Sequence, residues 1–264
     1  MNRPLISIIL PTFNSEQFLE KCLRSIGNQT YTNIEIIIID NYSSDKTKAI
    51  AKKYGKVIEH KGLRSAARNI GASFAKGDFL LSIDADMELS SNVISECLAK
   101  VKLNFDAIII PEISVGKGFW AKCKALEKRC YIGNWLVEAA RFFSREKFEE
   151  VKGYDVSLEA GEDWDLHFRY KKMGFRIGRI KAFIKHMEGN LVLRKSLHKK
   201  YLYGKTFSRY IRKHPDIARK QLGISRLLCL IDWKSLIENP QYFIGLILMK
   251  SLEFVVYEAG RIIA

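Results

Sequence analysis

Short apolar runs alternate along the first half of the chain with segments in which apolar residues recur every three to four positions. The runs begin at Leu5, Ile34, Val57, Phe79 and Ala107. Runs of this kind predict buried strands, and the periodic segments between them predict helices. Strands that alternate with helices build βαβ units. The pattern therefore predicts an α/β fold with a mostly parallel sheet, flanked by helices on both faces.

Turn and cap residues set the bounds of the remaining predicted elements. We expect helices over about 16–28 and 92–104, and a third from the acids after Gly161 to Gly174. A further strand is predicted at Ala140–Ser144, and one or two more between Phe175 and Lys185, ending at His186. The glycine-containing stretch Val115–Trp120 is predicted to be a mobile loop.

Polar residues follow three of the predicted strands. They are Thr12 and Asn14, then Asp40, then Asp84 and Asp86. In a parallel sheet such strand ends meet at one edge, where ligands bind. Asp84 and Asp86, two residues apart, offer hard oxygen ligands for Mg²⁺ or Mn²⁺ carrying a polyphosphate. The alternative is that both acids only end a strand and cap the following turn.

Composition narrows the class of protein. With 264 residues, 47% hydrophobic and 28% charged, the chain is long enough for a large core and has globular composition. Its five cysteines are scattered and never in C-x-x-C spacing, which argues against a zinc site or a disulfide framework. The N-terminus lacks the apolar segment of a secretory signal. We therefore expect an intracellular protein.

The net charge of +15 is concentrated near the C-terminus. Residues 191–264 contain 14 basic and 5 acidic side chains, a balance of +9, whereas residues 1–190 contain 30 and 24, a balance of +6. Such a basic region predicts a polyanionic partner, either nucleic acid or an anionic membrane surface.

Five short motifs together resemble those of the family 2 inverting glycosyltransferases, which have the glycosyltransferase A fold. The resemblance covers about residues 5–190, with the motifs in the family's order and spacing. They are Ser7–Asn14, Ile39–Asn41 with Ser44–Asp45, Ala67–Gly71, Asp84–Asp86 and Gly161–Asp163. Each motif is weak alone, and their combination carries the resemblance.

The resemblance implies a nucleotide-sugar donor, with a UDP- or GDP-sugar expected. It assigns donor binding to Pro11, Thr12, Asn14, Asp40, Arg68, Asn69 and Asp84. Two of these assignments have structural alternatives. Asp40 would equally cap its turn through Ser43, and Arg68 would equally pair with one of the acids or cover the sheet edge.

The resemblance also implies a metal site, with Asp84 contacting the ribose or the metal and Asp86 binding the metal. His186 is the expected third ligand of Mn²⁺ or Mg²⁺, although an isolated histidine is more often structural. The metal would act as a Lewis acid that holds the diphosphate.

Asp163 is the predicted general base, with Glu162 beside it. Helix capping is the alternative for these acids and for Asp165. Trp164 and Trp120 are predicted acceptor contacts, although Trp164 would equally pack in the core.

Residues 193–213 place apolar and basic side chains on opposite sides of a helix. A basic helix rich in tyrosine and phenylalanine suits a membrane interface, although its apolar side would also suit packing on the rest of the protein.

The segment 222–233 is apolar. The stretch 242–264 has Lys250, Glu253, Glu258 and Arg261 on one side, which favours a helix lying in the interface or against a partner over one that crosses the bilayer.

We therefore expect a catalytic domain over 1–190 and a basic, amphipathic helical region over 191–264. The predicted enzyme is a hexosyltransferase with a lipid-linked or membrane-associated glycan acceptor. It would lie in the cytoplasm on the inner face of the membrane, with a homodimer as the competing use of the C-terminal region and no nucleic-acid partner. The alternatives are a sugar-1-phosphate nucleotidyltransferase, whose glycine-rich basic signature residues 11–17 lack, and a nucleic-acid-binding protein.

Overall fold

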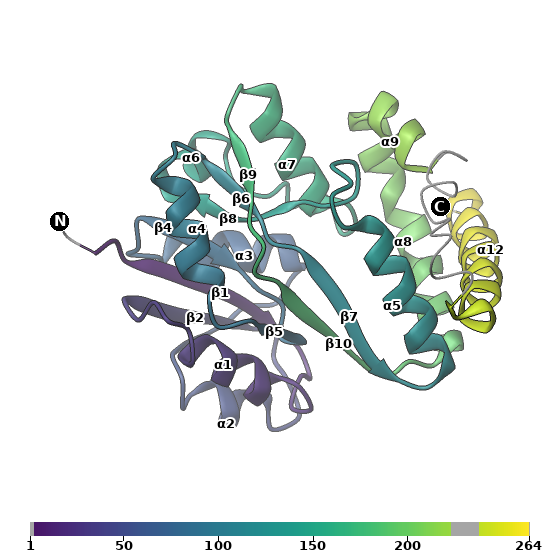
Figure 1. Cartoon of the computed structure of the whole chain (residues 1–264), viewed down its shortest axis with the longest axis horizontal. Helices are drawn as coiled ribbons and strands as arrows, with labels where there is room; N and C mark the ends of the chain where they lie inside the picture. Colours follow the sequence, from purple (N-terminus) through teal and green to yellow (C-terminus); the bar gives the residue numbers. More distant parts are fainter. Residues whose placement is uncertain (1–2, 223–237, 264) are drawn as a thin grey trace. The chain divides into compact units, whose positions relative to one another are not determined.

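A computed structural model describes residues 3–222 and 238–263 of the chain (Figure 1). The chain forms two compact units. Unit 1 comprises Met1–Pro111, Ala139–Val156 and Asp163–Lys185, and unit 2 comprises Glu112–Glu138, Ser157–Glu162 and His186–Ala264. Unit 2 therefore also draws on segments from the middle of the chain. The predicted catalytic domain over 1–190 stays a prediction.

Unit 1 contains a seven-stranded sheet with the order β3-β2-β1-β4-β8-β6-β9. Its strands are β1 (Ile6–Thr12), β2 (Ile34–Asp40), β3 (Lys56–Glu59), β4 (Phe79–Ser82), β6 (Ala107–Ile109), β8 (Ala140–Ser144) and β9 (Ile177–Arg179). Neighbouring strands run parallel except at β8, which is antiparallel to both β4 and β6. The predicted mostly parallel α/β sheet is confirmed.

Helices cover both faces of this sheet. They are α1 (Leu19–Gly27), α2 (Thr47–Ala51), α3 (Arg64–Ser73), α4 (Val93–Val101), α6 (Arg145–Glu150) and α7 (Glu162–Lys172). Successive residues of β1 enter different cores: Ile8 and Leu10 pack with residues of α1 and α4, whereas Ile9 packs with residues of α3 and α7. A strand buried on both sides has no polar face, which explains the continuous apolar run in the sequence.

A smaller sheet has the order β5-β10-β7, formed by β5 (Met87–Leu89), β10 (Ile184–Asn190) and β7 (Glu112–Lys117). Two expectations need correction here. Val115–Trp120 is not a loop, because β7 extends to Lys117 and α5 (Phe119–Tyr131) begins two residues later, after Gly118 with a φ of 84°. His186 does not follow a strand but lies within β10, because the pairing continues to Asn190.

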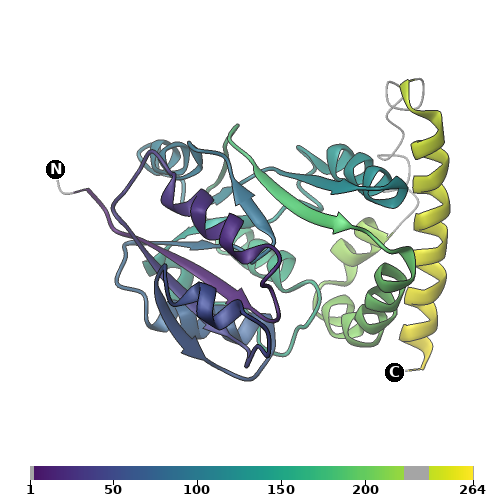
Figure 2. The ribbon, with the colours of Figure 1, turned by 90° about the horizontal axis from the view of Figure 1, so that it is seen from below.

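The predicted helix over 193–213 is confirmed as α8 (Leu193–Lys213), followed by α9 (Pro215–Leu222) and by α12 (Pro240–Ile262). In Figure 2, α8 lies beside the long α12. The approach is close: a Cβ added at Gly204 would lie 2.1 Å from the Tyr257 carbonyl oxygen, and one at Gly260 would lie 2.2 Å from that of Tyr201. Only glycine permits this contact at both positions. Beyond Leu222, the predicted apolar segment 222–233 lies outside the described residues.

Lysine and glutamate side chains of unit 2 meet between α5, α8 and α12. The Nζ atom of Lys124 lies 2.6 Å from Glu127 Oε2, and Lys250 Nζ lies 2.9 Å from Glu127 Oε1. Lys200, on α8, is influenced by both of these lysines. Burial, and then the repulsion from Lys124, lowers the pKa of Lys200 to about 7, although Glu253 and Glu127 oppose this shift.

This environment predicts a pH dependence of stability. An unfolded lysine keeps its proton up to about pH 10. Since folded Lys200 releases its proton near pH 7, its contribution to the free energy of unfolding should rise with pH above 7. Between pH 7 and pH 9, wild type should gain roughly 2 kcal/mol relative to Lys200→Met, measured by urea unfolding. The exposed neighbour Lys199→Met is the control and should keep the wild-type pH profile. Equal pH profiles for wild type and Lys200→Met would contradict the prediction.

Candidate active site

The carboxyl ends of β1 and β2 lie side by side, because Thr12 is in register with Asp40. The buried Asp40 carboxylate accepts hydrogen bonds from Thr12 Oγ1 at 3.1 Å and from Ser43, through its backbone N–H at 2.9 Å and its hydroxyl at 2.6 Å. This is the turn-capping arrangement that the sequence left open. Oδ1 accepts two of these bonds and Oδ2 accepts one, so a lone pair is left on Oδ2, and the contact of Asp40 with a nucleoside stays a prediction.

Two other predicted donor residues belong to the same strand end. Pro11 lies within β1, and Asn14 follows it with a φ of 44°, a left-handed conformation that asparagine tolerates. The Asn14 side-chain oxygen accepts the Ser44 backbone N–H at 2.9 Å. Asn14 therefore ties the loop after β1 to the loop after β2.

Asp84 and Asp86 lie between β4 and β5, as predicted for a strand that delivers two acids to its carboxyl edge. Arg68 of α3 reaches this edge, and its side chain is only 1% exposed. Its Nη2 atom donates to Asp84 Oδ1 at 2.8 Å. Arg141 of β8 approaches the other oxygen, with Nη1 at 3.8 Å from Asp84 Oδ2.

These arginines determine the charge of Asp84. Burial by itself would raise the pKa of Asp84, but Arg68, Arg141 and Arg64 together hold that pKa well below its ordinary value. Asp84 therefore stays ionised at any physiological pH. Burial, and then the nearby Asp86 and Asp84 carboxylates, raise the pKa of the Cys22 thiol, which stays protonated.

Arg68 also contacts the predicted base. Its Nη1 atom donates to Asp163 Oδ1 at 2.8 Å, so one guanidinium links Asp84 with Asp163. Asp163 lies in the first turn of α7, and its side chain is 25% exposed. Within the described residues, its second oxygen, Oδ2, has no hydrogen-bonding partner. Of the predicted residues, Arg68, Asp84 and Asp163 are thus brought into direct contact.

Other residues near this contact have structural roles. The Asn69 amide donates to the Tyr154 carbonyl at 2.8 Å and accepts the Tyr154 N–H at 2.8 Å, and the ring of Tyr154 lies 5.2 Å from the Arg68 guanidinium. Asn69 is therefore a loop anchor, and its predicted contact with the nucleotide sugar stays a prediction. The buried Asp165 carboxylate pairs with Arg169 at 2.8 Å, which favours the structural alternative for this acid.

Arg141 and Tyr154 were not predicted as site residues. The sequence did contain a signal for Arg141, because this arginine lies in an apolar strand between Ala140 and Phe142. A charged side chain at such a position must have a buried partner or leave the sheet. The sequence contained no such signal for Tyr154, because its position depends on hydrogen bonds with the Asn69 side chain.

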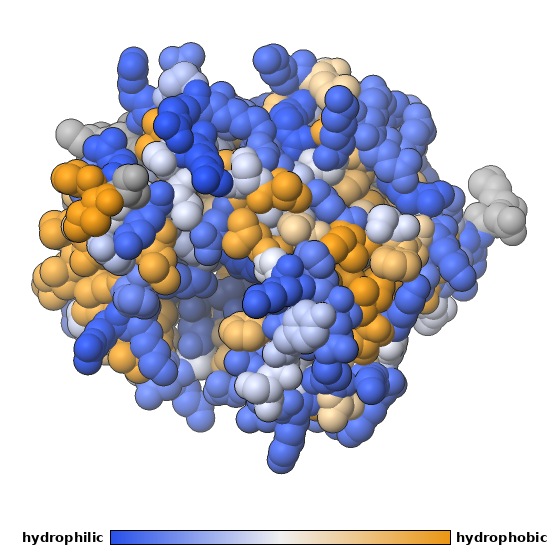
Figure 3. Space-filling model, turned by 180° about the vertical axis from the view of Figure 1, so that it is seen from behind, coloured by the Kyte–Doolittle hydropathy of each residue, from blue (hydrophilic) through white to orange (hydrophobic). Residues whose placement is uncertain are grey.

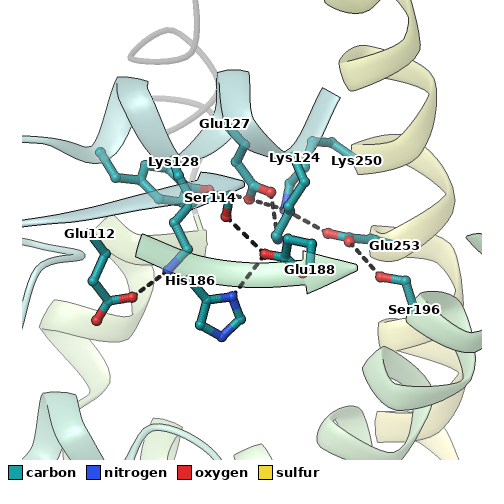
Figure 4. A network of polar contacts seen from close by, with 11 residues as sticks. Glu112, Ser114, Lys124, Glu127, Lys128, His186, Glu188, Ser196, Lys250 and Glu253 are labelled. Carbon is teal, nitrogen blue, oxygen red and sulfur yellow. Dashed lines mark hydrogen bonds and ion pairs between the residues drawn. The ribbon is translucent and has the colours of Figure 1, made fainter. Parts of the chain in front are cut away.

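Glu162, His186 and Trp120 belong to unit 2. Glu162 is buried, and Trp120 packs against Phe119 with ring centroids 5.0 Å apart. His186 Nδ1 lies 3.0 Å from Glu188 Oε1, and this oxygen accepts the Ser114 hydroxyl at 2.8 Å (Figure 4). A carboxylate at Nδ1 fixes the ring of a histidine and directs Nε2 outward, as for many metal ligands. Trp164, in unit 1, is partly exposed.

A divalent cation at this edge would need hard oxygen ligands. Across the parts of the chain that the structure describes, no three His, Cys, Asp or Glu side chains are grouped closely enough to hold a metal. Asp84 and Asp86 supply hard carboxylate oxygens from the short connection between β4 and β5. Mg²⁺ and Mn²⁺ commonly bind through one or two carboxylates plus substrate phosphates, so these two residues fit a metal that arrives with its polyphosphate.

The Arg68 contacts predict a measurable coupling. Arg68→Met should lower the free energy of unfolding by about 3–5 kcal/mol, because it leaves Asp84 and Asp163 without their shared cation. In an Asp84→Asn background the same change should cost less, and urea unfolding of the four proteins gives the coupling energy. Arg64→Met, on an exposed position of the same helix, is the control and should cost far less. Equal costs of Arg68→Met in both backgrounds would show that Arg68 and Asp84 are uncoupled.

Comparison with known proteins bears on the class of this site. The chain is 33% identical over 163 residues to the GalNAc(5)-diNAcBac-PP-undecaprenol beta-1,3-glucosyltransferase of Campylobacter jejuni, covering 56% of this chain and 52% of that protein. It is 31% identical over 154 residues to the uncharacterized glycosyltransferase EpsJ of Bacillus subtilis, covering 56% and 42%. The matches thus span about half the length of these curated relatives, or less.

Solved structures share the fold at lower identity. The mannosyltransferase PcManGT from Pyrobaculum calidifontis, in complex with GDP-Man and Mn²⁺, has a TM-score of 0.67 and 16% identity, covering 99% of this chain and 88% of that one. Residues 1–349 of TarS from S. aureus, in complex with UDP-GlcNAc, have a TM-score of 0.58 and 17% identity, covering 97% and 90%. These similarities confirm the predicted glycosyltransferase A fold.

The sequence profile described as Glycosyl transferase family 2 matches residues 7–199, most of the chain and all of the motifs that surround the Arg68 contacts. The chain belongs to glycosyl transferase family 2.

Proposed function

We propose that this protein is a metal-dependent inverting glycosyltransferase that moves a hexosyl unit from a UDP- or GDP-sugar to a hydroxyl group of the acceptor. The observation that carries this proposal is the contact of one buried guanidinium with both Asp84 and Asp163. One-step inversion needs a donor diphosphate on one side of the anomeric carbon and a base on the other. Arg68 links a candidate for each role inside unit 1.

On the donor side, Asp84 and Asp86 are the proposed metal-binding residues, with Mn²⁺ or Mg²⁺ as the cation. Support comes from their carboxylate chemistry and from PcManGT, a structural neighbour in complex with GDP-Man and Mn²⁺. When bound, the cation would offset the negative charge that develops on the departing nucleoside diphosphate. His186 as a third protein ligand stays a prediction, because the described residues contain no group of three such side chains.

The proposed nucleotide pocket is formed by the strand ends that contain Pro11, Thr12, Asn14 and Asp40. Arg68 and Asn69 would lie on the diphosphate side. Arg68 and Arg141 surround Asp84 with positive charge, which suits a site that receives a diphosphate.

On the acceptor side, Asp163 is the proposed general base. Arg68 holds Asp163 Oδ1, which leaves Oδ2 to take the proton of the attacking hydroxyl. As this proton leaves, the hydroxyl oxygen attacks the anomeric carbon, and the bond from that carbon to the diphosphate oxygen breaks. Glu162 precedes Asp163 and is the alternative base. Trp164 and Trp120 are proposed acceptor contacts through stacking on a sugar face.

A lipid-linked or membrane-associated glycan is the proposed acceptor class. One relative is named for a lipid-linked glycan, GalNAc(5)-diNAcBac-PP-undecaprenol. We propose that this protein acts in the cytoplasm at the inner face of an anionic membrane. Within residues 3–222 and 238–263, none of the helices combines the length and apolarity needed to span a bilayer.

Donor binding separates this function from its alternatives. Thermal-shift measurements should show stabilisation by a UDP- or GDP-sugar that depends on Mn²⁺, since a ligand at 100 times its Kd adds about 2.7 kcal/mol. Asp86→Ala should abolish the Mn²⁺-dependent part, because the diphosphate then lacks its cation. Stabilisation by nucleoside triphosphate with sugar-1-phosphate would favour a nucleotidyltransferase. Stabilisation by nucleic acid alone, with steep salt dependence, would overturn the enzyme assignment.

The base assignment predicts a separation of binding from turnover. Asp163→Asn should bind donor nearly as wild type does but turn over roughly 10²-fold or more slowly, the usual scale for a lost general base. Single-turnover rates and donor affinities of Asp163→Asn and Glu162→Gln test this. A full rate for Asp163→Asn together with a slow Glu162→Gln would transfer the role to Glu162.

A further inference from the structure

The last helix of unit 2 directs two of its charged residues, Lys250 and Glu253, inward. Lys250 Nζ lies 2.9 Å from Glu127 Oε1 and 2.7 Å from Glu253 Oε2, and Glu253 also accepts a hydrogen bond from the Ser196 hydroxyl at 3.4 Å. Figure 4 shows these side chains pointing toward one another from α5, α8 and α12. Glu253 is 3% exposed. These contacts fix which side of α12 faces the rest of unit 2.

The opposite side of α12 is apolar and exposed. Its exposed fractions are 67% at Ile244, 41% at Ile247, 50% at Leu248, 58% at Phe254, 63% at Val255 and 79% at Ile262. At 100° per residue these six positions fall in an arc of about 120°. Ser251 and Glu258 share this arc, and Glu258 pairs with Arg261 at 2.9 Å. A helix of a water-soluble protein has the reverse arrangement, so this face is suited to an apolar environment.

An aromatic and lysine cluster lies on the inward side of α12, at the start of the helix. Phe119 contacts Trp120 with ring centroids 5.0 Å apart and Tyr242 with centroids 5.7 Å apart. Lys122 Nζ donates to the Tyr242 hydroxyl at 2.8 Å. Trp120 and Tyr242 also pack against buried apolar residues of α5 and α12, so the cluster holds α5 against the inward side of α12.

Positive charge dominates the surface of the same C-terminal region. Among its described residues, ten basic side chains are exposed and only two acidic ones, Asp216 and Glu238. The exposed basic residues are Arg194, Lys195, Lys199, Lys205, Arg209, Arg212, Lys213, Arg219, Lys220 and Arg261. Figure 3 shows apolar side chains gathered at the side of the molecule where α12 lies, with hydrophilic ones beside them.

We propose that α12 is the membrane-docking element of this protein, with its outward apolar face inserted among the headgroups of an anionic bilayer. This inference rests on the proposed function for its membrane-bound acceptor and names the surface that reaches it. The sequence suggested both residues 193–213 and residues 242–264 for this role. In the structure, the apolar side of α8 is used for packing, with Phe207 and Tyr210 buried and Phe207 against Tyr257 of α12.

Charge favours a bilayer over a second copy of the chain as the occupant of this face. Two copies would bring together two regions with 14 basic and 5 acidic residues each, and like charges repel. Anionic lipids attract the same charges. A helix with an apolar face and a basic surround lies in the plane of the interface, in keeping with inward-facing charges that prevent α12 from crossing the bilayer.

Vesicle co-sedimentation of the full chain tests the proposal. Wild type should bind vesicles of phosphatidylcholine with about 30 mol% phosphatidylglycerol more tightly than phosphatidylcholine alone, and less tightly at about 0.5 M salt. The double variant Leu248→Gln with Val255→Gln should partition about tenfold or more weakly, because two exposed apolar side chains no longer enter the bilayer. The matched control is Leu103→Gln with Val156→Gln, which changes two similarly exposed residues of unit 1 and should bind as wild type.

Donor binding and sedimentation of the same preparations separate the outcomes. Wild-type vesicle binding by the α12 variant would overturn the proposal. A concentration-dependent dimer that the α12 variant loses, without vesicle binding by wild type, would overturn it in favour of a second copy. Stabilisation by the donor without binding to vesicles would overturn the membrane-docking inference and leave the proposed function supported. Binding to vesicles without stabilisation by the donor would overturn the proposed function and leave the membrane-docking inference supported. Retained donor stabilisation in both double variants shows that they are folded.

Discussion

The geometry of unit 1 depends on one buried cation. A guanidinium that is 1% exposed would be strongly unfavourable alone, and Arg68 is tolerated because Asp84 and Asp163 each lie 2.8 Å from it. The three residues come from α3, the end of β4 and the start of α7. The requirement to pair this charge therefore fixes the relative positions of two helices and a strand end. The ion pairs of Arg68 therefore both position this edge of the sheet and keep Asp84 ionised.

Under the proposed function, this contact has a second consequence. Asp84 is surrounded by Arg68 and Arg141, and its pKa is held far below its usual range, so the site is charged before any ligand arrives. A diphosphate with its cation would then replace existing ion pairs with similar ones and would not create charge in an apolar environment. Preorganised charges of this kind need little rearrangement during a reaction, which is why they are effective in transition-state stabilisation.

Unit 2 also pairs its buried charges, and this pairing orients a helix. Lys124, Glu127, Lys250 and Glu253 neutralise one another between helices, which places Lys250 and Glu253 on the inward side of α12. Its apolar residues are consequently left on the surface. The close contacts at Gly204 and Gly260 add a steric constraint, because α8 and α12 approach too closely for any side chain there. Orientation of α12 is thus a result of charge pairing and close packing.

Local patterns in the sequence determined much of this protein. Continuous apolar runs predicted β1, β2 and β4, because a strand buried on both faces admits no polar alternation, and strand ends with Asp40, Asp84 and Asp86 predicted one functional edge. Periodicity predicted α8 with its bounds.

Only the tertiary structure decided the contacts of the site. Arg68 joins Asp84 to Asp163, which lies 95 residues after Arg68 in the chain. Asn69 holds Tyr154, and Arg141 approaches Asp84 from an antiparallel strand. A helical wheel likewise separated charged from apolar residues on α12 but left open which side faces inward. The reason is physical: periodicity is a property of neighbours along the chain, whereas the pairing of buried charges depends on side chains that only folding brings within hydrogen-bonding distance.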